Sequence, residues 1–173
     1  ISGMFAFAIW DKKGKTLFIA RDRLGIKPLY YAQTSKGFYF ASTLPALLEV
    51  PDVDKNLDPV SLNYYMSLHA IVPAPGTMLK GIRKLEPGYT MLVHAEDRKI
   101  HKERYWNLDY SQNHTEVLTT EEWQEQLLTL LIRAVKRRLV ADVPVGVLLS
   151  GGLDSSLIVG LLAEMAYTPE TFS

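Results

Sequence analysis

The chain has 173 residues, 47% of them hydrophobic and 22% charged, which is ordinary for a globular protein of one domain or two small ones. Its 19 basic and 19 acidic residues give no net charge, so no basic field indicates binding to nucleic acid or to a membrane surface. Cysteine is absent and no apolar run is long enough to span a bilayer, which excludes a disulfide framework, a thiolate metal site and a membrane-spanning helix.

The front part of the sequence predicts antiparallel β structure. Residues 4–10 are apolar on both faces, as in a strand buried in layered sheets, and residues 16–20 are the return strand after a lysine-glycine turn. Residues 29–33 and 38–41 form a second predicted hairpin. The first strand starts almost at once and without a methionine, so we interpret the chain as an internal segment of a longer protein.

A helix is predicted next, because Asp58 can cap its N-terminus and Pro59 suits its first position. We expect this helix to end near Leu68 and to be followed by an extended segment over residues 72–76. Residues 89–94 and 100–105 predict a further hairpin. The polar, aperiodic residues 107–118 are interpreted as a linker between domains, which leaves residues 1–106 as the first domain and 119–173 as the second.

The second domain opens on a capping box, Thr119 with Glu122. Residues 145–149 predict a short buried strand, and residues 156–166 an apolar helix, which is the order of a parallel α/β unit. The final residues 171–173 look like the start of another strand. The helix after the capping box carries apolar residues at helical spacing, which predicts one buried stripe made of Trp123, Leu127, Leu130, Leu131, Ala134, Val135 and Leu139.

A glycine-rich loop, Ser150-Gly151-Gly152-Leu153-Asp154-Ser155-Ser156, connects this strand to the apolar helix. Its glycines let the backbone approach a ligand closely, and the free N–H groups of the helix that follows favour an anion. Asp154 would repel a phosphate unless Mg²⁺ lies between them. The alternative interpretation is a glycine turn with a serine cap, but the complete seven-residue string at a strand-to-helix junction favours phosphate binding.

These residues resemble a known family. Residues 150–156, preceded by residues 142–149, are similar to the pyrophosphatase loop of asparagine synthetases, and residues 3–11 and 20–31 look like the late strands of a class II glutamine amidotransferase domain. The resemblance implies α/β and α+β parts. Residues 1–106 would be the end of an Ntn-type glutaminase β-sheet domain, and residues 119–173 the start of a parallel α/β ATP-pyrophosphatase domain, adenine nucleotide alpha hydrolase-like.

The family resemblance also implies a reaction and its cofactors. ATP adenylylates a carboxylate with release of pyrophosphate, and ammonia from glutamine then displaces AMP to give an amide, as in asparagine biosynthesis. Mg²⁺ would be held by Asp154, and Leu149 would lie beside the nucleotide. The resemblance further implies glutamine and a carboxylate acceptor as partners and a cytoplasmic location, and it allows a homodimer. The loop residues expected to bind ATP are Leu149, Ser150, Gly151, Gly152, Leu153, Asp154, Ser155 and Ser156.

Several family residues have no counterpart in this chain. The glutaminase nucleophile of the family is an N-terminal cysteine, which this segment lacks, so we assign no catalytic residue within it. Two other hypotheses therefore stay open. One is a synthetase whose glutaminase domain is inactive, as in β-lactam synthetases, and the other is a nucleotide-binding scaffold without catalysis.

The acceptor is indicated by a finer resemblance. Thr43 stands where asparagine synthetases usually have glutamate, and residues 69–75 with 83–85 look like the N-acetylglutaminylglutamine amide synthases. That resemblance implies a dipeptide acceptor in place of aspartate. Arg21, Asp22, Arg23 and Lys27 could form a further polar site, but an ion-pair network that anchors the hairpins is the interpretation we favour.

Overall fold

The structure, a computed structural model, describes residues 1–111 and 118–173. The chain divides into two compact units, Ile1–Tyr110 and Ser111–Ser173, and each is described by itself. The linker predicted over residues 107–118 spans this division, and its residues 112–117 lie outside the described residues. In the described ranges, no helix has both the length and the apolar character needed to cross a membrane.

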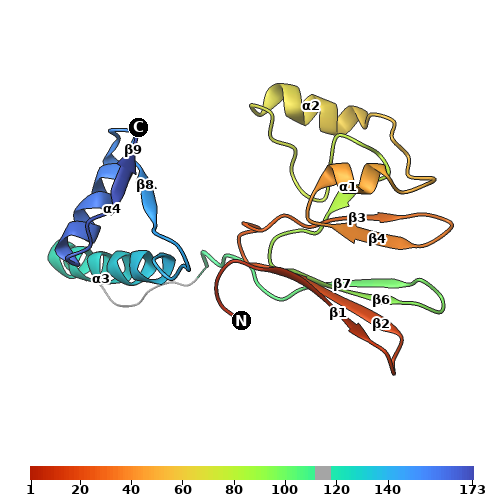
Figure 1. The fold of residues 1–173 in the computed structure, drawn as a ribbon, viewed down its shortest axis with the longest axis horizontal. Coiled ribbons are helices and arrows are strands. Elements are labelled where there is room, and N and C mark those ends of the chain that lie inside the picture. The colour runs from red at the N-terminus through yellow and green to blue at the C-terminus, as the bar shows by residue number, and fades with distance from the viewer. Residues whose placement is uncertain (112–117) are drawn as a thin grey trace. The chain divides into compact units, whose positions relative to one another are not determined.

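Two antiparallel sheets form the first unit (Figure 1). The larger has the order β1-β2-β6-β7, with β1 at Ala6–Asp11, β2 at Thr16–Arg21, β6 at Tyr89–His94 and β7 at Ile100–Arg104. The smaller has the order β4-β3-β5, with β3 at Tyr30–Gln33, β4 at Phe38–Ala41 and β5 at Arg83–Lys84. The three predicted hairpins are thereby confirmed, while β5, only two residues long, was not predicted.

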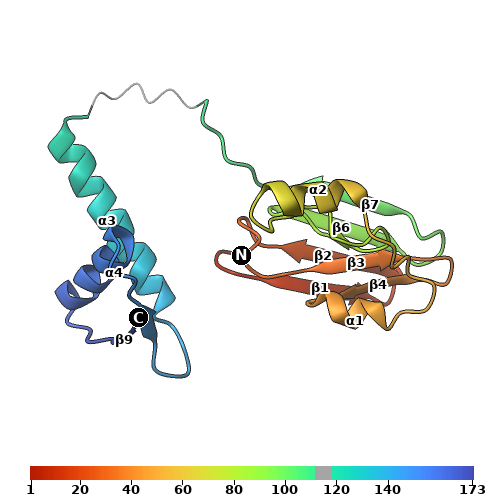
Figure 2. The ribbon, with the colours of Figure 1, turned by 90° about the horizontal axis from the view of Figure 1, so that it is seen from above.

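The main core of this unit lies between the two sheets. Each large apolar side chain buried there contributes about 1.5–3 kcal/mol to folding. Helix α1 (Leu44–Leu48) packs on the other face of the smaller sheet, and Figures 1 and 2 show α2 (Pro59–Ser67) on that side as well. The intersheet core consists of Ile19, Leu29, Tyr31, Leu85, Met91 and Val93.

The start of α2 confirms the predicted cap. The Asp58 carboxylate accepts a hydrogen bond from the Ser61 N–H at 2.8 Å, and Pro59 occupies the first helical position. Asp58 thus satisfies one of the N–H groups that a helix start leaves without an intrahelical acceptor.

The second unit contains α3 (Thr120–Arg138), β8 (Gly146–Leu148), α4 (Leu153–Glu164) and β9 (Glu170–Phe172). β8 and β9 pair in parallel, with α4 between them in the chain, as the predicted α/β unit requires. The capping box is present: the Thr119 hydroxyl accepts from the Glu122 N–H at 3.2 Å, and the Glu122 carboxylate accepts from the Thr119 N–H at 2.7 Å.

Three predictions for the second unit need correction. The strand predicted over residues 145–149 is not buried: β8 spans Gly146–Leu148, and Leu148 is 81% exposed. α4 begins at Leu153 and not at Ser156, because Gly152 acts as its N-cap. The stripe on α3 is buried only in its second half, where Val135 packs with Leu161 and Leu162 of α4. α4 has 12 residues against 19 in α3, so it covers only part of that helix. In the first half of the stripe, Trp123, Leu127 and Leu130 are each about half exposed.

Candidate functional site

The loop between β8 and α4 is held at both ends by backbone hydrogen bonds. The Leu149 N–H donates to the Phe172 carbonyl at 2.7 Å, which extends the pairing of β8 with β9. The Ser156 N–H donates to the Gly152 carbonyl at 3.1 Å, which closes the first turn of α4. The intervening segment is short, so its serine hydroxyls lie at the N-terminus of the helix.

The backbone of this loop is open towards solvent. Gly151 has a φ of +75°, a left-handed conformation that favours glycine, and a Cβ placed there would meet no atom within 4 Å. No side chain in the described part of the structure caps α4. The N–H groups of its first turn can therefore bind an anion, and the helix dipole would favour that anion.

The side chains of the loop complete a polar cradle. The hydroxyls of Ser150 and Ser155 lie 3.2 Å apart, and the Ser155 hydroxyl donates to the Gly152 carbonyl at 3.1 Å. Asp154 is exposed in the first turn of α4. Leu153 is 85% exposed, Ser156 is exposed and Leu149 is half-buried, so the predicted residues surround one helix terminus.

A magnesium ion fits this site only as a companion of bound phosphates. Among the described residues there is no group of three or more His, Cys, Asp or Glu side chains that could hold a metal ion. Asp154 offers one carboxylate, and Mg²⁺ commonly binds through one or two carboxylates together with substrate phosphates and water. One carboxylate with bound phosphates would suffice for a Mg²⁺ ion, and the role of Asp154 stays a prediction.

In the first unit, the polar residues around Asp22 bind backbone groups. The Asp22 carboxylate is 2% exposed and accepts from four backbone N–H groups at 2.9 to 3.3 Å, those of Phe5, Leu24, Ile26 and Lys27. Burial acts to raise the pKa of Asp22, but these hydrogen bonds outweigh it, so its pKa lies below the usual value.

Arg21 complements Asp22. Its guanidinium donates to the carbonyls of Gly25, Lys27 and Leu85 at 2.5 to 2.8 Å, and its side chain is buried with it. Arg21 and Asp22 therefore anchor the loop, as favoured from the sequence. They do so through hydrogen bonds to the backbone and not through ion pairs. Arg23 lies 6.0 Å from the centre of the Trp106 ring and takes no part in the Asp22 bonds.

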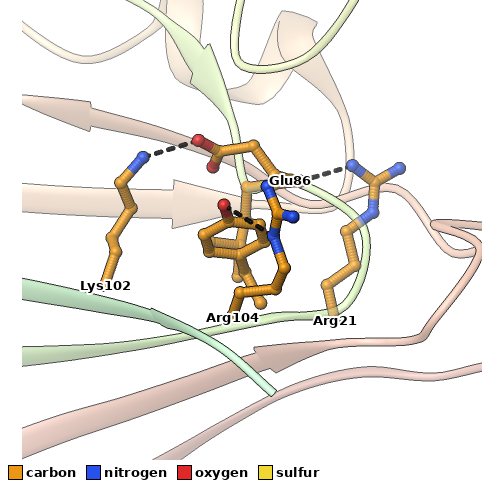
Figure 3. Close-up of polar contacts among 6 residues, drawn as sticks. Arg21, Glu86, Lys102 and Arg104 are labelled. Atoms are coloured by element: carbon orange, nitrogen blue, oxygen red, sulfur yellow. Dashed lines mark hydrogen bonds and ion pairs between the residues drawn. The ribbon is translucent and has the colours of Figure 1, made fainter. Parts of the chain in front are cut away.

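A further polar cluster lies between the sheets of the first unit and was missed by the sequence analysis (Figure 3). Lys102 forms an ion pair with Glu86 at 2.7 Å, and the second Glu86 oxygen, Oε2, is buried without a hydrogen-bond partner among the described residues. Arg104 donates to the Tyr89 hydroxyl at 3.0 Å. Strand periodicity places Lys102 on the same face as Ile100, which packs on the core, but it gives no signal for the partner Glu86.

Comparisons with known proteins match both units. The family model described as "Glutamine amidotransferase domain" matches residues 1–106, and the one described as "Asparagine synthase" matches residues 126–173. The putative asparagine synthetase [glutamine-hydrolyzing] 2 of Methanocaldococcus jannaschii is 40% identical over 94% of this chain and 31% of its own length. Asparagine synthetase [glutamine-hydrolyzing] 3 of Bacillus subtilis is 39% identical over 94% of this chain and 26% of its own length.

The chain therefore spans about a third or less of the curated relatives that it matches. A solved structure, the glutamine phosphoribosylpyrophosphate amidotransferase of B. subtilis complexed with ADP and GMP, aligns over 98% of this chain and 32% of its own. That alignment has a TM-score of 0.36 and 14% identity.

Proposed function

The chain belongs to the glutamine amidotransferase family through residues 1–106, and from this premise we propose that the intact protein is a glutamine-dependent, ATP-dependent ligase that turns a carboxylate into an amide. The observation that carries the proposal is the loop Ser150–Ser156, whose N–H and hydroxyl groups surround an uncapped helix terminus. The asparagine synthase match over residues 126–173 supports the same reaction class.

In this proposal ATP activates the acceptor carboxylate as an acyl adenylate, and pyrophosphate leaves. The N–H groups of the first turn of α4 and the hydroxyls of Ser150, Ser155 and Ser156 would bind the pyrophosphate part of ATP. Leu149 would lie beside the nucleotide. These donors are already in place before the bond breaks, so they would stabilise the charge that develops on the leaving group.

Asp154 would hold Mg²⁺ against the phosphates. The ion would supply charge neutralisation for the leaving pyrophosphate. The position of Asp154 in the first turn of α4 brings its carboxylate to the helix end where the anion would bind.

Analysis of the products formed from ATP tests the reaction. The intact protein, given glutamine and its acceptor, is expected to release AMP and pyrophosphate, since the loop lacks the lysine of a Walker-type phosphate loop. ADP and phosphate would contradict the proposal. Turnover with ammonium but not with glutamine would identify an inactive glutaminase domain, and ATP binding without product would identify a scaffold.

For the acceptor, we propose an N-acetylglutaminylglutamine-like dipeptide in preference to aspartate. The support is the resemblance around Thr43 and residues 69–75. A site built for aspartate has groups that pair with its ammonium and α-carboxylate. An acylated dipeptide would leave those groups of the site unpaired, and rejection on such grounds reaches about 10⁴-fold. One acceptor should therefore dominate.

Pyrophosphate release with each acceptor at equal concentration measures this preference. Turnover with the dipeptide alone is expected. Turnover with aspartate alone would assign the protein to ordinary asparagine synthesis while leaving the proposed reaction class intact.

A further inference from the structure

A cleft of about 460 Å³ opens in the first unit, whereas the loop proposed to bind ATP belongs to the second unit. Both sheets contribute to it: Tyr31 and Gln33 come from β3 and Arg83 from β5, while Ile100 and Lys102 come from β7. Its volume is in the range of small-molecule sites in proteins, roughly 300–1,000 Å³.

The charge of this cleft is strongly one-sided. Lys80, Arg83 and Lys102 line it, and no carboxylate is found among its described lining residues. Glu86 pairs with Lys102 but is not part of the lining, which leaves an excess of positive charge towards the cleft. The backbone of Arg83 pairs with Tyr31 in the sheet, but its guanidinium has no hydrogen bond or ion pair within the described residues and can bind a ligand.

Lys102 is an oriented cation and not a loose surface lysine. Its ammonium is held by Glu86 at 2.7 Å and lies 6.0 Å from the centre of the Tyr89 ring, and 31% of its side chain is exposed (Figure 3). An ammonium has three N–H donors, and Glu86 uses one of them. Burial acts to lower the pKa of Lys102, but Glu86 and the tyrosines Tyr31 and Tyr89 raise it above its usual value, so the group stays charged.

Tyr31 adds a neutral donor. It is 7% exposed, its ring stacks on Phe38 at 5.8 Å, and it lines the cleft beside Lys102. The structure gives its hydroxyl no hydrogen-bond partner within residues 1–111 and 118–173. Burial raises the pKa of Tyr31, so the phenol keeps its proton and can donate it to an acceptor.

We propose that this cleft is a binding site for a small oxyanion, a phosphate or a dicarboxylate, held by Arg83, Lys102 and the Tyr31 hydroxyl. The planar guanidinium of Arg83 suits two parallel hydrogen bonds to such a group, and the ammonium of Lys102 adds a fixed charge. Lys80 strengthens the field that attracts the anion. The site is separate from the proposed amide-forming reaction and does not depend on it.

Titration calorimetry of the intact protein with inorganic phosphate, and separately with succinate, tests the proposal. Arg83→Gln is expected to weaken binding about tenfold or more, because it removes charge-assisted hydrogen bonds. Lys12→Gln is the matched control, since Lys12 is an exposed lysine in the β1–β2 turn, and it should change the affinity by less than about twofold.

Lys102 needs a paired substitution, because Lys102→Met alone would leave the buried Glu86 without its cation. The double variant Glu86→Gln with Lys102→Met avoids this and should also lose binding. Binding of phosphate alone or of succinate alone supports the site and identifies its ligand class. Absence of binding for both anions overturns the proposal, as does equal affinity in wild type and Arg83→Gln, which would assign the bound anion to another site such as the Ser150–Ser156 loop.

Discussion

Two loops of this molecule follow a β-strand, contain a left-handed glycine and carry an aspartate, yet they use these residues in opposite ways. After β2, Asp22 is buried and its carboxylate accepts hydrogen bonds from four backbone N–H groups. After β8, Asp154 is exposed beside a helix terminus that no described side chain caps. In the first loop the carboxylate is hydrogen-bonded within the protein, and in the second loop the carboxylate is exposed to solvent.

The difference shows how a structural loop and a ligand-binding loop can be told apart. Residue types do not decide it, because both loops hold glycine and a carboxylate. What decides it is whether each donor and acceptor already has a partner in the protein. Substitutions in either loop can therefore break or support this distinction.

Removing the Asp22 carboxylate should have the largest effect. Asp22→Ala leaves several buried N–H groups without an acceptor, at about 1–3 kcal/mol each, so we expect the unfolding free energy of the first unit to fall by about 4 kcal/mol. Urea denaturation measures it. The control is Asp11→Ala, which removes an exposed carboxylate that accepts from the Lys13 N–H at 2.9 Å, and should cost under about 1 kcal/mol. Similar losses in both variants would contradict a structural role for the Asp22 loop.

Asp154→Asn should act on activity and not on stability. In the intact protein we expect amide synthesis to fall at least about a hundredfold, the loss seen when one partner of a developing charge is removed. Glutamine hydrolysis should be retained, because the loop belongs to the second unit. Glu164→Gln at the other end of α4 is the control. Loss of both activities in a folded Asp154→Asn protein would mean that the loop is structural.

Much of this fold could be predicted from local sequence. The hairpins follow from alternation and turn residues, and α2 and α3 follow from their caps at Asp58 and Thr119, where one side chain and a nearby N–H decide the start. Helix α1 and strand β5 were missed because five and two residues are too few to show a period.

The features that local sequence did not predict depend on contacts between residues far apart in the chain. Strand β1 begins at Ala6 and not at Met4, and the N–H of Phe5 donates instead to Asp22, a residue seventeen positions away. The loop residues 149–156 could be proposed as a site because strand, loop and helix are consecutive in the chain. The Lys102 cluster could not, since Glu86 and Tyr31 meet Lys102 only when two sheets stack.

Acid should weaken the Asp22 loop in a predictable direction. The pKa of Asp22 in the folded protein lies below its value in an unfolded chain, about 3.9, so its carboxylate contributes stability that is complete above that pH. The contribution is lost as the pH falls from about 4 towards the folded pKa. Urea midpoints between about pH 5 and pH 3 should fall more steeply for wild type than for Asp22→Asn. Parallel curves would show that Asp22 does not supply this dependence.

The two glycines give the smallest and most closely matched test. Gly25 has a φ of +66° and Gly151 a φ of +75°, so alanine at either position pays a similar backbone cost, about 1 kcal/mol. At Gly25 the added Cβ would also lie 2.7 Å from Pro87 Cγ and 3.1 Å from the Arg21 guanidinium, whereas at Gly151 it meets nothing within 4 Å. Gly25→Ala should therefore lose about 1 kcal/mol more than Gly151→Ala, because overpacking adds to the backbone term. Urea denaturation of the two variants measures the difference, and equal losses would mean that the packed loop yields as easily as the open one.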